Sequence, residues 1–528
     1  MRPRSLARAA LSVSALYAFG SLIGFAQRVV VTTRFGTSAE YDAFNAAFRI
    51  PDLLFSLLAG GALASAFIPI FVAHLSQGRV GLAWRLARAV VFLVCGALAV
   101  LAALAALLAP WLVGTIVAPG FDDGQVELTT SLMRIMLLGT VVFGASGLMM
   151  GVLQSNGAFI APALAPSLYN LGIIFGATAL HGFGIYGVAF GVVIGALLHL
   201  GVQLPSLARV LRNTRHAARD ASAEPANSDP IRRDVRQVVR LMLPRIAGLG
   251  AVQINFIVNT NLASGMGVGA VSALNIAFAV MILPQVAIAQ AIATVLFPSI
   301  SAHAARDERA EYGAMVTRAV GAVLALSVPA AFGLILLGQP LIGLLFERGA
   351  FGSEATQAVA FTLAWFAVGL AGHSVLEVVT RGFYALQDTL RPVVLGVISM
   401  AVNIALSLAL SAAFGNAGLY PYGGLALANS LATAIETAVL LGMLARRNPA
   451  IAMGRIAVSS AKSVLSACVM AAALVLWLSI AGDGPIAVLS AIPAGAAVYA
   501  GVAFLLRSEE ARVAAALARS RLGRFRRP

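Results

Sequence analysis

Two apolar segments of the chain end in similar sequences. The first closes with Phe67-Ile68-Pro69-Ile70-Phe71-Val72-Ala73-His74 and the second with Phe297-Pro298-Ser299-Ile300-Ser301-Ala302-His303, so the histidines are 229 residues apart (303 minus 74). A second landmark agrees, because Leu153-Gln154 precedes Asn170 and Leu386-Gln387 precedes Asn403, 233 residues later (403 minus 170). Chance matches arise easily in an apolar, alanine-rich chain. Two landmarks at nearly one offset nevertheless favour a tandem repeat of about 230 residues.

The composition is that of a polytopic membrane protein. Of 528 residues, 60% are hydrophobic and only 11% are charged, whereas soluble domains carry about 25% charged residues. A helix needs about 20 apolar residues to cross a bilayer core of about 30 Å. The apolar runs are continuous rather than alternating, which excludes a transmembrane β-barrel. We predict an all-α fold with about fourteen transmembrane helices at 10–33, 53–74, 88–113, 129–153, 159–180, 184–205, 240–263, 270–298, 315–337, 356–380, 391–413, 423–445, 456–481 and 485–507.

Basic residues gather in every second loop, which accounts for the net charge of +15 without a nucleic-acid partner. Cytoplasmic loops of membrane proteins carry this excess of Arg and Lys. The pattern predicts that both termini are cytoplasmic and that the basic loops lie against anionic membrane lipids. The first apolar stretch is long and lacks a small-x-small cleavage site, so we interpret it as a retained helix rather than a signal peptide.

The spans divide into two copies of six helices and two additional helices. An even number of spans in each copy predicts parallel repeats, a plan that transporters use to build two halves around one site. A polar, irregular linker separates the copies, and the basic stretch Ile231–Arg240 has the spacing of an amphipathic helix on the inner leaflet. The predicted domains are an N-terminal lobe at 1–212, a cytoplasmic linker at 213–236, a C-terminal lobe at 237–447, the last two helices at 448–507 and a basic cytoplasmic tail at 508–528.

Charged residues inside apolar spans cost roughly 2.5–3.5 kcal/mol on insertion scales, so each needs a reason. Arg28 and Arg245 lie in the helices that open the two copies, and they could face one central cavity from opposite lobes and bind an anionic group such as a diphosphate. Snorkelling to the headgroups is the alternative, and it is favoured for Arg134 and Lys462 near helix ends. Glu377 and Glu436 could serve a proton or sodium cycle, although pairing with an arginine is the favoured interpretation.

Catalysis of the kind seen in soluble enzymes finds no support. The chain has no G-x-x-x-x-G-K-[ST] motif, its six histidines lack ligand spacing, and Cys95 and Cys468 lie in the middle of predicted helices. We therefore expect no cofactor, no metal site and no enzymatic activity. The enzyme alternative is an intramembrane glycosyltransferase with Glu40 or Asp42 of the first outer loop as its base. Short outer loops argue against it.

Several stretches resemble the MurJ (MviN) lipid II flippases of the multidrug/oligosaccharidyl-lipid/polysaccharide exporter superfamily. They run in the family's order from helix 1 to helix 11. The stretches are Gly24-Phe25, Arg34-Phe35-Gly36, Tyr41-Asp42-Ala43-Phe44, Ala47 to Leu54, Ala66-Phe67-Ile68-Pro69, Pro162 to Asn170, Leu296-Phe297-Pro298 and Gly382 to Pro392.

The resemblance implies two six-helix lobes in a V shape, a central cationic cavity, and a groove for a polyprenyl tail beside the last two helices. It implies transfer of an undecaprenyl-diphosphate-linked peptidoglycan precursor between leaflets of the cytoplasmic membrane, with cell-wall synthesis machinery as a candidate partner. The candidates for cavity residues are Arg28, Asp42, Arg49, Arg134 and Arg245.

The chain departs from the family at three arginines. The family's usual cations correspond to Ser21 in helix 1, Ser56 in helix 2 and Ala279 in helix 8. The family's other arginine in helix 1 is displaced by one position, to Arg28, and one residue turns a helix by about 100°. The departures favour two alternatives, which are a flippase for another polyprenyl-linked glycan or lipid, and a scaffold of envelope assembly that does not transport.

Overall fold

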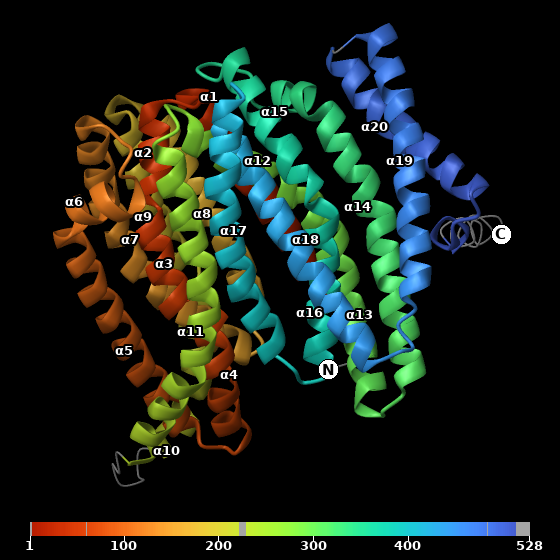
Figure 1. Cartoon of the computed structure of the whole chain (residues 1–528). Coiled ribbons are helices and arrows are strands. Elements are labelled where there is room, and N and C mark those ends of the chain that lie inside the picture. The colour runs from red at the N-terminus through yellow and green to blue at the C-terminus, as the bar shows by residue number, and fades with distance from the viewer. Residues whose placement is uncertain (1–2, 60, 221–228, 483, 514–528) are drawn as a thin grey trace, which may run out of the picture. The chain divides into compact units, whose positions relative to one another are not determined.

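The computed structural model describes residues 3–59, 61–220, 229–482 and 484–513, and this part of the chain is helical with no strand (Figure 1). Each of the fourteen predicted segments lies mainly in helix. Ten described helices are long and apolar enough to cross a membrane, and two bent helix pairs raise the number to twelve. The protein is therefore an all-α, multi-pass membrane protein, as the sequence predicts.

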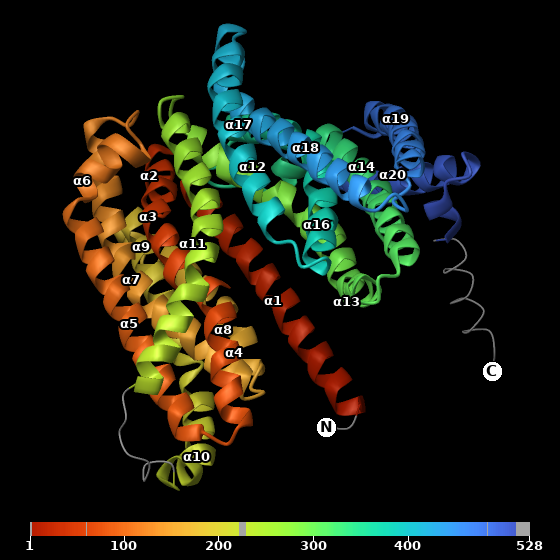
Figure 2. The ribbon, with the colours of Figure 1, turned by 60° about the horizontal axis from the view of Figure 1, so that its bottom comes forward.

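The chain divides into two compact units, residues 1–272 with 348–351 and residues 273–347 with 352–528. In the first unit, α11 (Asp229–Ser264) packs against α3 (Arg49–Leu58), α4 (Gly61–Ser76) and α5 (Val80–Leu107). The helix α11 opens the second copy in sequence, but it packs with the first copy. The boundary between the compact units therefore falls after Ser272 and not at the predicted linker. Figure 2 shows α11 running beside α3, α4 and α5.

Much of the predicted linker is helical. The helix α10 (Leu204–Asp220) covers its first residues, and α11 already begins at Asp229. The expectation of an irregular linker over 213–236 is thus wrong at both ends, while residues 221–228 lie outside the described part of the chain. The physical reason is that Ala and Arg, which make up four of the eight residues from Asn213 to Asp220, are strong helix formers. The stretch Ile231–Arg240 is helical, as its spacing predicts.

Helix packing repeats in the two copies. In the first, α4 packs on α5 and α7 (Asp123–Ser155), α5 on α7, α7 on α9 (Ile185–Gly201), and α9 on α8 (Ile160–Thr178). In the second, α13 (Ala291–Ala305) packs on α14 (Arg309–Phe346) and α16 (Leu370–Ala385), α14 on α16, α16 on α18 (Pro421–Arg447), and α18 on α17 (Leu390–Asn416). His74 lies near the end of α4 and His303 near the end of α13. The shared order of contacts confirms two parallel repeats.

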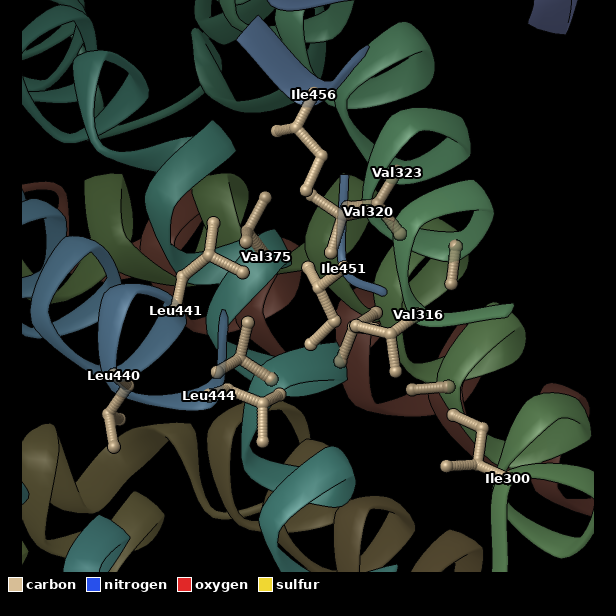
Figure 3. Close-up of a cluster of buried hydrophobic side chains, with 14 of the residues drawn as sticks. Ile300, Val316, Val320, Val323, Val375, Leu440, Leu441, Leu444, Ile451 and Ile456 are labelled. Atoms are coloured by element: carbon tan, nitrogen blue, oxygen red, sulfur yellow. The ribbon is translucent and has the colours of Figure 1, made fainter. Parts of the chain in front are cut away.

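Each unit has its own apolar core. In the second unit, Val316, Val320 and Val323 of α14 gather with Leu440 and Leu444 of α18 (Figure 3). In the first unit, the core is formed by α4, α5 and α7, with α11 contributing to it, and its members include Phe67, Phe71, Leu86, Leu148 and Met242. These cores hold the helices that carry the polar side chains described below.

Glycines set the closest helix contacts. A methyl group on Gly172 of α8 would collide with the backbone of Gly195 of α9, and one on Gly176 would collide with the backbone at Gly187. Small residues four positions apart let membrane helices approach closely. This spacing explains why α8 and α9 lie against each other along their length.

Several spans are broken. The helices α15 (Ser353–Val368) and α16 meet at an angle of 44° beside Gly369, where a side chain would collide with Ser430. The second predicted span is split between α3 and α4. The remaining elements are α2 (Ala39–Ala47), α6 (Ala109–Trp111), η1 (Leu112–Val117), η2 (His181–Phe183), α12 (Ala270–Gln285), η4 (Val286–Gln290), α19 (Met453–Ala481) and α20 (Pro485–Leu505), with α1 (Pro3–Phe35) at the start.

Candidate functional site

A seam of polar side chains joins α3 to α11 in the first unit. On α3 it is formed by Arg49, Asp52 and Ser56, and on α11 by Gln253, Phe256 and Thr260. On both helices the residues are spaced at i, i+3 and i+7, which places them on one face. Of this set, only Arg49 was predicted from the sequence as a site residue, although the matching spacing on the two helices was a signal that could have found the rest.

Arg49 is the central cation of the seam. Its Nε donates to Thr260 Oγ1 at 2.7 Å, and its guanidinium carbon lies 5.5 Å from the centre of the Phe256 ring. A guanidinium over an aromatic face at this distance makes a cation–π contact. Asp52 lies beside Arg49, and Gln253 Nε2 donates to Ser56 Oγ at 2.9 Å. The seam therefore fixes a half-buried positive charge at the start of α3.

Asp42 is fully buried and holds the start of α12. Its two carboxylate oxygens accept from the backbone N–H groups of Gly269, at 2.6 Å, and Ser272, at 2.7 Å. A carboxylate that accepts N–H donors at a helix N-terminus is a capping group. The geometry thus gives Asp42 a structural contact, and it leaves no accessible carboxylate there for a catalytic base.

The other sequence-predicted arginines differ in their surroundings. Arg134 on α7 donates from Nε to the carbonyl of Ala106 in the last turn of α5, at 3.0 Å, so it caps that helix. Arg28 on α1 and Arg245 on α11 are exposed. Both belong to the first compact unit, because α11, although it opens the second copy in sequence, packs with that unit. That the two arginines face one cavity stays a prediction.

The two acidic candidates lie in the second unit. Glu377 Oε2 is 3.4 Å from Arg381 Nη2 one helical turn later, and Arg381 Nη1 donates to Thr294 Oγ1 at 2.9 Å. Glu377 is therefore paired with an arginine of its own helix. Glu436 on α18 is half-buried beside Gly396 and Ser399 of α17.

A large cavity in the second unit has a volume of 1390 Å³ and lies along α14, α19 and α20. Figure 1 shows these three helices side by side. Most of the lining is apolar and includes Leu334, Leu337, Met470, Leu474 and Ile492. An apolar channel of this size suits a hydrocarbon chain. Individual residues could not reveal it, because apolar side chains on a membrane helix do not indicate whether they face lipid or protein.

One end of this cavity is charged. Its lining there contains Arg318 of α14, Arg455 and Lys462 of α19, and residues 507–513 after α20. Among these, Glu510 accepts a hydrogen bond from Ser459. Burial alone would raise the pKa of Glu510, but hydrogen bonds from Ser508 and Ser459 and the Lys462 charge outweigh it and lower that pKa. The cavity therefore combines apolar walls with a cationic mouth.

Comparison with known sequences gives a consistent result. The family model described as lipid II flippase MurJ matches residues 31–495. A lipid II flippase MurJ of Burkholderia cenocepacia is 33% identical over 79% of this chain and 80% of its own length. A probable lipid II flippase MurJ of Rhizobium meliloti is 31% identical over 92% of this chain and 90% of its own.

Solved structures share the fold. A lipid II flippase MurJ in an inward closed conformation superposes with a TM-score of 0.77 at 23% identity, covering 94% of this chain and 98% of its own. An inward-facing multidrug resistance MATE family transporter of the MOP superfamily gives a TM-score of 0.66 at 14% identity, covering 84% of this chain and 98% of its own. At these identities the likeness speaks for the fold alone.

Proposed function

The chain belongs to the MurJ family of lipid II flippases, and we propose that it moves lipid II, the undecaprenyl-diphosphate-linked peptidoglycan precursor, from the inner to the outer leaflet by alternating access. The observation that carries the proposal is the 1390 Å³ cavity along α14, α19 and α20, whose apolar walls suit a polyprenyl tail.

The cargo divides physically into two parts. Its diphosphate and sugars cannot cross hydrocarbon without replacing their lost hydration, because an unpaired buried charge costs many kcal/mol. We assign contacts with this head group to Arg28, Arg49 and Arg245, because guanidinium groups bind phosphate oxygens in a bidentate way. The polyprenyl tail stays in apolar surroundings throughout, and we assign it to the cavity.

We propose that the protein lies in the cytoplasmic membrane. Both termini would lie in the cytoplasm and the basic loops on the inner leaflet. The loop charges support this orientation. Proteins of peptidoglycan synthesis are the expected partners, since they supply and consume the cargo. We expect the transfer to need no cofactor.

Two alternatives rest on the arginines that the family usually carries. Ser21, Ser56 and Ala279 stand in their place, which favours a different polyprenyl-linked glycan as cargo or a scaffold without transport.

Complementation tests the proposed function. The chain is expressed in a strain depleted of its own lipid II flippase, and growth and lipid II accumulation are measured. We expect growth to be restored and the accumulated precursor to fall. If the protein is abundant and correctly inserted but the lipid II level stays high, the proposal is contradicted. Transfer of other polyprenyl-linked glycans between leaflets would then be measured to separate the two alternatives.

A further inference from the structure

The chain turns back on itself at the charged mouth of the cavity. Beyond α20, Arg507 has a φ of +53°, and Ser508 N donates to the carbonyl of Ala503 at 2.9 Å. The following residues line the cavity together with Arg318 and Lys462. Lys462 Nζ donates to the carbonyl of Arg507 at 3.2 Å, which fastens the turn to α19. The segment from Arg507 to Val513, here called the C-terminal latch, is thus docked over the mouth.

Glu510 is the part of the latch that enters the mouth. Ser459 Oγ of α19 donates to Glu510 Oε1 at 2.7 Å, and Ser508 Oγ donates to Glu510 Oε2 at 2.6 Å. The carboxylate fits because residue 321 of α14 is glycine, since a methyl group there would lie 2.5 Å from Oε1. A negative group is therefore held between two helices by a hydroxyl donor beside the Lys462 charge.

The latch supplies the acidic groups of the mouth, and it also carries Arg507 and Arg512. Outside the latch, the charged residues among the described cavity lining are all basic, and they are Arg318, Arg455 and Lys462. Both acidic lining residues, Glu509 and Glu510, belong to the latch. If the latch leaves, three cations and the Ser459 hydroxyl remain at the end of an apolar channel, without an anion.

We propose that this mouth is a binding site for the phosphate of an anionic membrane phospholipid, and that Glu510 occupies it as a competing internal anion. The match is with a phosphodiester, which carries one negative charge and two free oxygens, as the Glu510 carboxylate does. The acyl chains would enter the channel below, so the phospholipid and the polyprenyl tail would occupy this channel in turn and not together. Arg455 lies in the first turn of α19 and Lys462 two turns further on, and long basic side chains near a helix end reach toward headgroup phosphates. The proposal concerns a phospholipid and shares only the channel with the proposed cargo, so undecaprenyl diphosphate is included among the probes below.

Native mass spectrometry of the full-length protein tests the site. The probes are phosphatidylglycerol, phosphatidylcholine and undecaprenyl diphosphate, and the variants are Glu510→Gln and its matched control Glu509→Gln, which removes the same charge from the neighbouring residue. Loss of the competing anion should raise phosphatidylglycerol retention roughly tenfold in Glu510→Gln, as expected for one charge-assisted contact. Glu509→Gln should bind as the parent does, and Lys462→Gln added to Glu510→Gln should abolish the gain.

A second measurement keeps the proposal independent of any folding defect. Phosphatidylglycerol added to the unmodified protein should increase amide hydrogen exchange at residues 508–513, because lipid and latch compete for one site. Equal lipid binding by Glu510→Gln and Glu509→Gln, or unchanged exchange in saturating phosphatidylglycerol, would overturn the proposal. A gain for undecaprenyl diphosphate alone would also overturn it and would identify a cargo-loading site.

Discussion

His74 Nε2 lies 2.8 Å from Asp234 Oδ2, and this pair joins the end of α4 to the start of α11 across 160 residues of sequence. Its counterpart in the other copy, His303, has Nδ1 2.6 Å from Glu308 Oε2, only five residues away. The repeat has thus kept a histidine at the helix end and changed its partner. In the first copy the contact fixes α11 to the first unit.

A double-mutant cycle should detect the energy of the His74–Asp234 pair. Both side chains are largely buried, with 12% and 17% exposed, so we expect a coupling free energy of about 1 kcal/mol, above the median for surface pairs. His74→Ala, Asp234→Ala and the double variant are compared by thermal unfolding in detergent. The control is the Arg309–Asp307 pair, with 69% and 79% exposed, which should show no coupling. Equal coupling free energies in the two pairs would show that the His74–Asp234 contact stabilises the fold no more than an exposed surface pair does.

Filling the apolar cavity should block transport. Gly333 of α14 lines the cavity, and a Cβ there meets no atom within 4 Å, so Gly333→Phe adds a ring to the channel without a backbone clash. Gly501 of α20 is equally open but does not line the cavity. We expect Gly333→Phe to abolish complementation at normal abundance and Gly501→Phe to retain it. Similar growth of both variants would contradict the assignment of the tail to this cavity.

Variants of Thr260 should separate the charge of Arg49 from its packing. Thr260→Val removes the hydroxyl that accepts from Arg49 Nε, whereas Thr260→Ser keeps it. Losing a hydrogen bond to a charged group costs about 1.5–3 kcal/mol. Thr260→Val should therefore lower the unfolding temperature more than Thr260→Ser. If Arg49 binds the cargo head group, Arg49→Ala should lower transport per molecule well below that of Thr260→Val. Equal transport in these two variants would assign Arg49 to structure only.

Restoring the family's arginines should improve complementation if head-group binding is limiting. Each charge-assisted contact contributes about 1.5–3 kcal/mol, so three lost cations weaken binding by orders of magnitude unless others replace them. Ser21→Arg and Ala279→Arg are the informative changes. Ser56→Arg also breaks the hydrogen bond from Gln253, so its gain should be smaller. Full complementation by the parent chain with no gain from any variant would show that Arg28, Arg49 or Arg245 already suffices.

Acid should release the C-terminal latch. The pKa of Glu510 is lowered from its ordinary value of 4.5, so its ionised form stabilises the docked latch above that value and this contribution is lost as the pH falls through the lowered one. Hydrogen exchange at 508–513, corrected for intrinsic rates, should rise on acidification, and Glu510→Gln should remove the dependence. The charged groups lining the same cavity are Arg318, Arg455, Lys462, Arg507, Arg512 and Glu509. A response that persists in Glu510→Gln and disappears in Glu509→Gln would reassign the titrating group.

Most of the helices could be predicted from sequence because crossing a bilayer is a local demand. A span needs only enough consecutive apolar residues, and the chain shows such runs without reference to any partner. The bends and ends of the helices were harder to predict. The bend beside Gly369 depends on the approach of Ser430 from α18, and α10 extends into the linker because helix propensity outweighs the polar composition there.

The sequence by itself determined the membrane class, the parallel repeat and the family resemblance. Apolar run length, loop charge and landmark spacing are properties of the linear sequence and need no knowledge of tertiary contacts. Only the tertiary structure decided what each charge contacts. Asp42 caps a helix that begins at Ala270, Arg49 meets Thr260, and Glu510 enters the mouth beside Ser459. Such partners lie about 50 to 230 residues apart, and a rotation of about 100° per residue means that only packing fixes which face of a helix meets them.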